Sequence, residues 1–157
     1  MQPLNYALAF LVSFLGLYCG LALAFIAPEE LKAGRKYFIL LTRIIFALVL
    51  AFLLLYFRLH WILVLVLVIG FFIMDYNHRI DERYIYALMA AALILSSLNT
   101  KLFILEASLI FLYGFPAGTL FTEKLVKKNI FAVAGKLFIN YFHYLVIAAL
   151  PLLVVYL

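Results

Sequence analysis

The chain has 157 residues, of which 70% are hydrophobic and 12% are charged, and its mean hydropathy is +1.23. Soluble domains carry about 25% charged residues, so this composition excludes a soluble globular surface and predicts an integral membrane protein. The formal net charge of +5 would suggest a nucleic-acid partner in a soluble protein. Here the bases lie between apolar segments, which indicates orientation in a lipid bilayer and no nucleic acid.

The apolar segments are continuous rather than alternating, which predicts helices and not the strands of a barrel. Because a span needs about 20 apolar residues, we expect an all-α, polytopic membrane protein with one domain, residues 1–157. The six predicted spans are residues 4–27, 37–57, 59–74, 84–98, 101–120 and 129–157. The third and fourth are short, so they need a turn of the polar segment between them or a thinner bilayer.

The polar segment between the first two spans has the pattern of a short capped helix. Pro28 suits a first helical position, Glu29 and Glu30 favour the positive end of a helix, and Gly34 suits its end. Residues 120–131 repeat this layout, with Thr122 as the expected N-cap. We therefore predict a small helix in each of these two turns.

Basic residues gather in every second turn. One set of turns carries Lys32, Arg35, Lys36, Arg79, Arg83, Lys124, Lys127 and Lys128. The other set carries only Arg58 and Lys101. The positive-inside rule then places the charged turns in the cytoplasm and both termini outside, with three tight hairpins in the bilayer. We expect the bases of the charged turns to contact anionic headgroups on that side.

The first hairpin recurs near the end of the chain. Leu17-Tyr18 recurs as Leu112-Tyr113, an offset of 95 residues, and Glu30 recurs as Glu123, an offset of 93. Spans one and five are four helices apart, so equivalent halves would point the same way. The pattern indicates a parallel internal repeat of spans 1–2 and 5–6, related by an axis near the membrane normal.

Small residues recur at helical spacing in the first and fifth spans. Gly16 and Gly20 form one GxxxG pair, and Gly114 and Gly118 form another. Small residues let helices approach closely in lipid. Two interpretations stay open, which are close packing within one chain and a homodimer face. Pro116 is expected to kink or break the fifth span.

Four ionisable residues lie within the predicted spans, and such residues are candidates for function. They are Arg43, Glu106, Lys136 and His143. Arg43 and Lys136 lie within about two turns of the cytoplasmic side, so their long side chains can reach lipid headgroups. Contact with a solute or a partner is the alternative for both.

Glu106 and His143 each lie 14 residues from the cytoplasmic end of their span, which predicts a similar depth. Lys136, Asn140 and His143 share one face of the sixth span. We therefore predict a polar site between spans five and six that binds a proton or a small solute. The alternative is a buried hydrogen-bond network that holds the two spans together.

The segment between the third and fourth spans contains Asp75 and His78, a spacing that permits metal binding. The interleaved Arg79 and Arg83 favour simple ion pairs, so neither a metal nor a cofactor is expected. The chain has no recognisable protease, phosphate-binding or lipid-transferase motif, which argues against an enzyme. The predicted function is a small permease or proton-linked transporter. The alternatives are a structural or accessory subunit of a membrane complex, with a homodimer or partner subunit, and an intramembrane lipid-modifying enzyme.

Overall fold

The computed structural model describes residues 3–78, 80–123, 125 and 129–156, and its regular structure there is entirely helical. The helices are α1 (Pro3–Ile26), α2 (Glu30–Tyr56), α3 (Trp61–His78), α4 (Glu82–Ser96), α5 (Thr100–Glu123) and α6 (Ile130–Tyr156). Each contains most of one predicted apolar segment. The expectation of an all-α chain with six helices is confirmed.

Four of the described helices are long and apolar enough to cross a membrane. They are α1, α2, α5 and the Ile130–Leu152 part of α6. The apolar part of α3, Trp61–Asp75, is shorter, and α4 has 15 residues. These are the two elements that the sequence predicts to be short. The helices are compatible with a multi-pass membrane protein.

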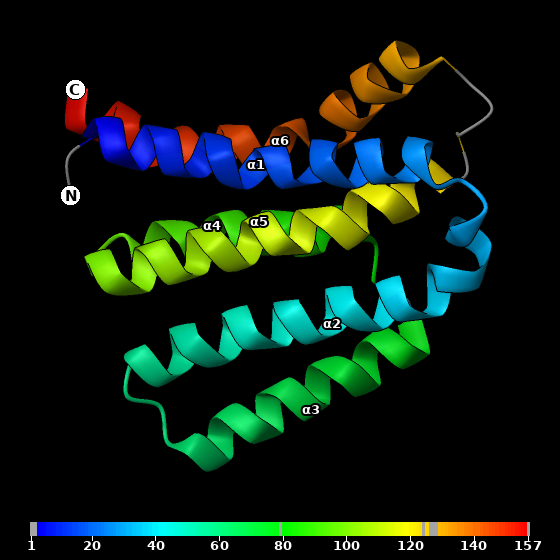
Figure 1. Cartoon of the computed structure of the whole chain (residues 1–157). Coiled ribbons are helices and arrows are strands. Elements are labelled where there is room, and N and C mark those ends of the chain that lie inside the picture. The colour runs from blue at the N-terminus through cyan, green and yellow to red at the C-terminus, as the bar shows by residue number, and fades with distance from the viewer. Residues whose placement is uncertain (1–2, 79, 124, 126–128, 157) are drawn as a thin grey trace.

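Successive helices run in opposite directions, so the start of α1 and the end of α6 lie at the same end of the bundle (Figure 1). Tyr6 near the start of α1 donates a hydrogen bond of 2.8 Å to the carbonyl of Ala148 on α6. The most extensive contact between two helices joins α1 and α5, which point the same way. α2 packs on α5, whereas α6 packs on α4 and α1. Among the described residues, the hairpin neighbours α5 and α6 contact each other little.

Glycines make the close contact between α1 and α5. A Cβ atom added to Gly16 would lie 2.1 Å from the carbonyl oxygen of Phe111, and one added to Gly118 would lie 2.1 Å from that of Leu17. A Cβ on Gly20 would likewise meet the Phe115 carbonyl, and one on Gly114 would meet the backbone of Gly16. Backbone atoms cannot move aside as a flexible side chain can. Both GxxxG pairs are therefore used for packing within one chain.

Two local predictions for the polar turns are wrong. The expected short helix ending at Gly34 does not form, because α2 begins at Glu30 and continues through Gly34 to Tyr56. A glycine inside a helix costs about 1 kcal/mol, which a helix of 27 residues tolerates. Thr122 is not an N-cap, since it lies inside α5 and its hydroxyl donates to the Gly118 carbonyl at 2.7 Å. α5 also continues unbroken past Pro116 to Glu123.

Tyrosines fill the core between α4, α5 and α6. The ring of Tyr86 lies 5.7 Å from that of Tyr113, 5.1 Å from that of Tyr141 and 4.9 Å from that of Tyr144, measured between centroids. All four side chains are buried. Rings at these separations attract one another beyond the effect of burial alone. Because every one of these contacts involves Tyr86, the cluster joins α4 to α5 on one side and to α6 on the other.

Candidate functional site

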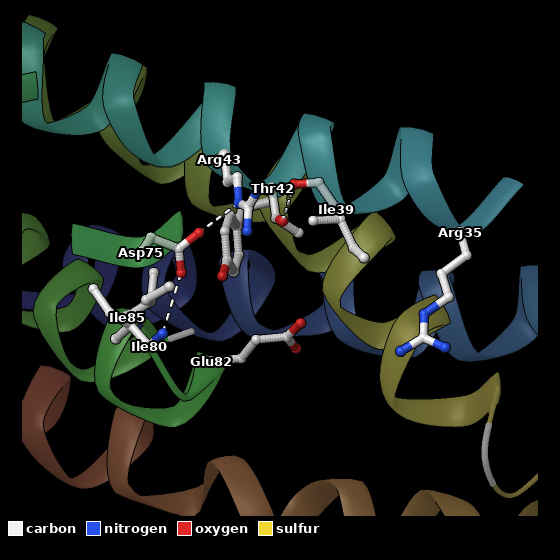
Figure 2. Close-up of a pocket in the computed structure, with 9 residues that line it drawn as sticks. Arg35, Ile39, Thr42, Arg43, Asp75, Ile80, Glu82 and Ile85 are labelled. Carbon is white, nitrogen blue, oxygen red and sulfur yellow. Dashed lines mark hydrogen bonds and ion pairs between the residues drawn. The ribbon is translucent and has the colours of Figure 1, made fainter. Parts of the chain in front are cut away.

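A charged pocket opens at the end of the bundle where α2 and α4 begin. Its volume is about 600 Å³. Its polar lining consists of Arg35, Thr42 and Arg43 from α2, Asp75 from α3, Glu82 from α4 and Tyr113 from α5. Figure 2 shows Glu82 directed into the opening between Arg43 and Arg35. We call this cavity the charged pocket.

An ion pair forms one wall of the charged pocket. The Nε atom of Arg43 pairs with Oδ2 of Asp75 (Figure 2). The other carboxylate oxygen of Asp75 accepts a hydrogen bond of 3.2 Å from the backbone N–H of Ile80. Asp75 is buried, and a buried charge is stable only when it is paired and hydrogen-bonded. Arg43, for which the sequence favoured a headgroup contact, thus joins α2 to the last turns of α3.

A second cavity of about 660 Å³ adjoins the charged pocket and shares Arg35 and Glu82 with it. It extends to Asn140 and Tyr141 on α6. The Tyr141 hydroxyl donates a hydrogen bond of 3.2 Å to Oε2 of Glu82. At its edge, Nε of Arg35 lies 3.6 Å from Oε2 of Glu123, which links the start of α2 to the end of α5. The Arg35 side chain is half exposed, so this pair contributes at most about 1 kcal/mol.

Glu106 lies in the core of the bundle. Its side chain is fully buried, and neither carboxyl oxygen has a hydrogen-bond partner among the described residues. It shares the buried face of α5 with Phe103, Ile110 and Tyr113, which lie three residues before it and four and seven after it. A buried carboxyl group without a partner is costly, so its presence needs a functional explanation.

Two tyrosine hydroxyls in the same core are also buried without a partner among the described residues, those of Tyr86 and Tyr113. Tyr113 follows Glu106 by seven residues, which is two helical turns or about 10 Å along α5. Tyr113 also lines the charged pocket. One face of α5 therefore leads from the pocket to the buried carboxyl group.

The structure separates the polar residues that the sequence grouped between spans five and six. Nε2 of His143 lies 2.8 Å from the carbonyl oxygen of Arg83 on α4, and no hydrogen bond joins His143 to Glu106. Asn140 lines the second cavity, and Lys136 is exposed. Counting residues from the turn fixes the depth of a side chain but neither the rotation of its helix nor the neighbour of that helix. α6 packs on α4 and α1 rather than on α5, so the predicted pair does not meet.

Sequence reasoning offered Arg79 and Arg83 as ion-pair partners for the acids of this segment, whereas Asp75 pairs with Arg43. It did not select Tyr113. A usable signal existed for Asp75, because it ends the third apolar segment on the side where Arg43 lies about two turns deep. Charges at similar depth on neighbouring helices tend to pair. Tyr113 gave no signal except its match to Tyr18 in the predicted repeat. Its importance comes from its position between the pocket and Glu106.

The predicted headgroup contacts stay predictions. Lys32 and Lys36 are exposed near the start of α2, with Nζ of Lys36 5.0 Å from the ring centroid of Tyr37. Lys124, Lys127 and Lys128 lie outside the described residues. Within the described part of the chain, no group of three or more histidine, cysteine or acidic side chains could hold a metal ion. Comparison of the chain with protein-family models, curated proteins and solved structures found no match.

Proposed function

We propose that the chain is a proton-linked permease for a small solute, built from six membrane-spanning helices. In this proposal the short helices α3 and α4 also cross the bilayer, and the three hairpins have their charged turns in the cytoplasm. Both termini then lie outside. The excess of bases in alternate turns and the alternating direction of the helices support this topology.

The proposed internal repeat relates α1–α2 to α5–α6. Its support in the fold is that α1 and α5 pack side by side in the same direction (Figure 1). The second helix of each half also packs on the first helix of the other half, α2 on α5 and α6 on α1. Transporters with parallel repeats place their substrate site near the interface of the halves. Glu106 is buried on α5, and in this proposal its buried face lines that interface.

The unpartnered carboxyl group of Glu106 is the observation that carries the proposal. A carboxyl group in a membrane core is neutral when it holds a proton, and it needs a cation when it does not. A site that alternates between these states couples proton movement to solute movement. In this proposal the solute enters through the charged pocket and the adjoining second cavity, which Asn140 lines. His143 and Lys136 are not among the residues that line the two cavities.

The test uses purified protein in liposomes that contain a pH-sensitive dye. Solutes from different classes (organic acids, amino acids, amines and sugars) are added outside, and solute-dependent acidification or alkalinisation of the interior is recorded. We expect one class to move protons in the wild-type protein and Glu106→Gln to abolish this coupling. Glu29→Gln, the same chemical change at an exposed position, leaves it intact.

Two results would contradict the proposal. One is proton coupling that survives in Glu106→Gln. The other is a correctly folded wild-type protein that moves no solute of any class tested.

An accessory subunit of a membrane complex is the second candidate, and α3 favours it. α3 packs chiefly on α2 and exposes most of its described side chains, including Trp61 and Ile69. In a complex this face would contact another subunit instead of lipid. Extraction in a mild detergent would then recover a partner in fixed stoichiometry. Recovery of a stable monomer that transports a solute would exclude this role.

A further inference from the structure

Three buried side chains of the described core carry polar atoms without a described partner: Glu106, Tyr113 and Tyr86. Tyr113 lines the charged pocket, and Glu106 lies two turns deeper on the same face of α5. The ring of Tyr86 lies 5.7 Å from that of Tyr113, and its hydroxyl is the third such group. Buried polar groups of this kind are commonly satisfied by ordered water.

The other side of Glu106 is closed by aromatic packing. Phe103, one turn before Glu106, is fully buried, and its ring stacks on that of Tyr6 at 5.2 Å between centroids. The Tyr6 hydroxyl donates a hydrogen bond of 2.8 Å to the Ala148 carbonyl, and a backbone carbonyl cannot pass a proton on. Among the described residues, the polar side chains on the buried face of α5 near Glu106 therefore lie toward the charged pocket.

The surroundings of the Tyr113 hydroxyl leave it able to pass a proton between water molecules, because it has no fixed hydrogen bond to a described residue. Its hydroxyl is fully buried, but no described residue fixes its orientation. The titratable groups that act on it electrostatically are Glu82, Tyr86, Tyr141 and Asp75. Glu82 and Asp75 belong to the lining of the charged pocket, so Tyr113 lies between pocket acids and the buried carboxyl group. A hydroxyl both donates and accepts a hydrogen bond, which lets it pass a proton from one water molecule to the next.

We propose that the Tyr113 hydroxyl, with ordered water on either side, is the link through which protons pass between the charged pocket and Glu106. Each transfer moves one proton along existing hydrogen bonds, and the Tyr113 oxygen receives a proton as it releases another. The proposal rests on the role of Glu106 in proton coupling. In the conformation that the structure describes, Glu106 thus exchanges protons with the charged pocket and not with the opposite end of the bundle.

The test measures hydrogen–deuterium exchange at the Glu106 carboxyl group by infrared spectroscopy of the reconstituted protein. The C=O band of protonated Glu106 is identified as the band that disappears in Glu106→Gln. The time course of its frequency shift after transfer to D₂O gives the exchange rate. We expect Tyr113→Phe to slow this exchange by about tenfold, the factor that one lost hydrogen bond makes. Tyr84→Phe, at a position where 70% of the residue is exposed, leaves the rate unchanged.

Folding does not obscure the result, because Tyr113→Phe removes only a hydroxyl that has no described partner. Its melting temperature should equal or exceed that of the wild type. An unchanged exchange rate in Tyr113→Phe overturns the link through Tyr113, while solute-driven proton movement that still depends on Glu106 leaves the proposed function intact. A protein without a Glu106 carboxyl band, in which Glu106→Gln also leaves proton movement unchanged, overturns both.

Discussion

Glu106 introduces a carboxyl group into a core that is mainly aliphatic and aromatic, with neither oxygen bonded to a described residue. Selection for stability alone would replace such a group by an apolar side chain of similar size. Its neighbours on the buried face of α5, Phe103 and Ile110, show that an apolar residue fits this face. A residue that lowers stability and makes no stabilising contact is a candidate for a functional role.

Glu106→Leu should therefore stabilise the protein while it abolishes proton coupling. The expected gain in the free energy of unfolding is about 1–3 kcal/mol, the cost of burying a polar group without a partner. Thermal unfolding in detergent, monitored by tryptophan fluorescence from Trp61, measures it. A loss of several kcal/mol instead would contradict an unpartnered carboxyl group and indicate that Glu106 makes a stabilising contact.

Arg43 and Asp75 show how far single residues could be predicted. The sequence marked Arg43 as a charge within a span and noted that Asp75 could form an ion pair, which gave the chemistry of the pair but not its partners. Pairing across α2 and α3 depends on the rotation of both helices about their axes. That rotation follows from which apolar faces pack, and a chain that is apolar nearly all round specifies it weakly.

At the level of helices, the contact between α1 and α5 organises the bundle. Four glycines allow these two backbones to touch, and Thr119 adds a hydrogen bond of 3.1 Å to the Gly20 carbonyl across the contact. The GxxxG spacing was visible in the sequence. The sequence did not show whether this spacing serves packing within one chain or a dimer, because a small-residue face has the same pattern in both cases.

Gly16→Ala should disrupt this contact. The added Cβ would lie 2.1 Å from a backbone oxygen, so the helices must separate, at a cost of about 1–3 kcal/mol. Gly70→Ala is the matched control, because a Cβ added to Gly70 on α3 would meet no atom of the described residues within 4 Å. There the substitution should stabilise the helix by about 0.5–1 kcal/mol. Thermal unfolding of both variants compares them directly, and an equal response would contradict the close contact at Gly16.

The short helix predicted to end at Gly34 was wrong because local capping signals do not decide where a long helix begins. Pro28, the paired glutamates and Gly34 satisfy the local rules for a short capped helix. Helix formation is cooperative, however, so a few helical residues next to a long apolar helix extend it rather than form a separate unit. α2 accordingly begins at Glu30.

For the whole molecule, the testable quantity is topology. In a background in which Cys19 is replaced by serine, single cysteines replace Lys32 and Leu98, which are both exposed. Lys32 is near the start of α2 and Leu98 is in the turn between α4 and α5, and these two segments lie at opposite ends of the bundle (Figure 1). A membrane-impermeant thiol reagent added to intact cells should label Leu98→Cys and not Lys32→Cys. Inside-out vesicles should give the reverse. Labelling of both positions from one side would contradict the proposed six-span topology.

The sequence by itself determined the all-α fold class and the number of helices, because both depend on composition and on the length of continuous apolar segments. It also located the titratable groups along each helix, since depth follows from a fixed rise per residue. Only the tertiary structure decided which helices are neighbours. It showed that His143 bonds to α4 and not to Glu106. It also placed Glu106 two helical turns from Tyr113, which lines the charged pocket. Neighbours are chosen by close packing of small residues and aromatic rings in three dimensions, and such packing leaves no unique pattern in an apolar chain.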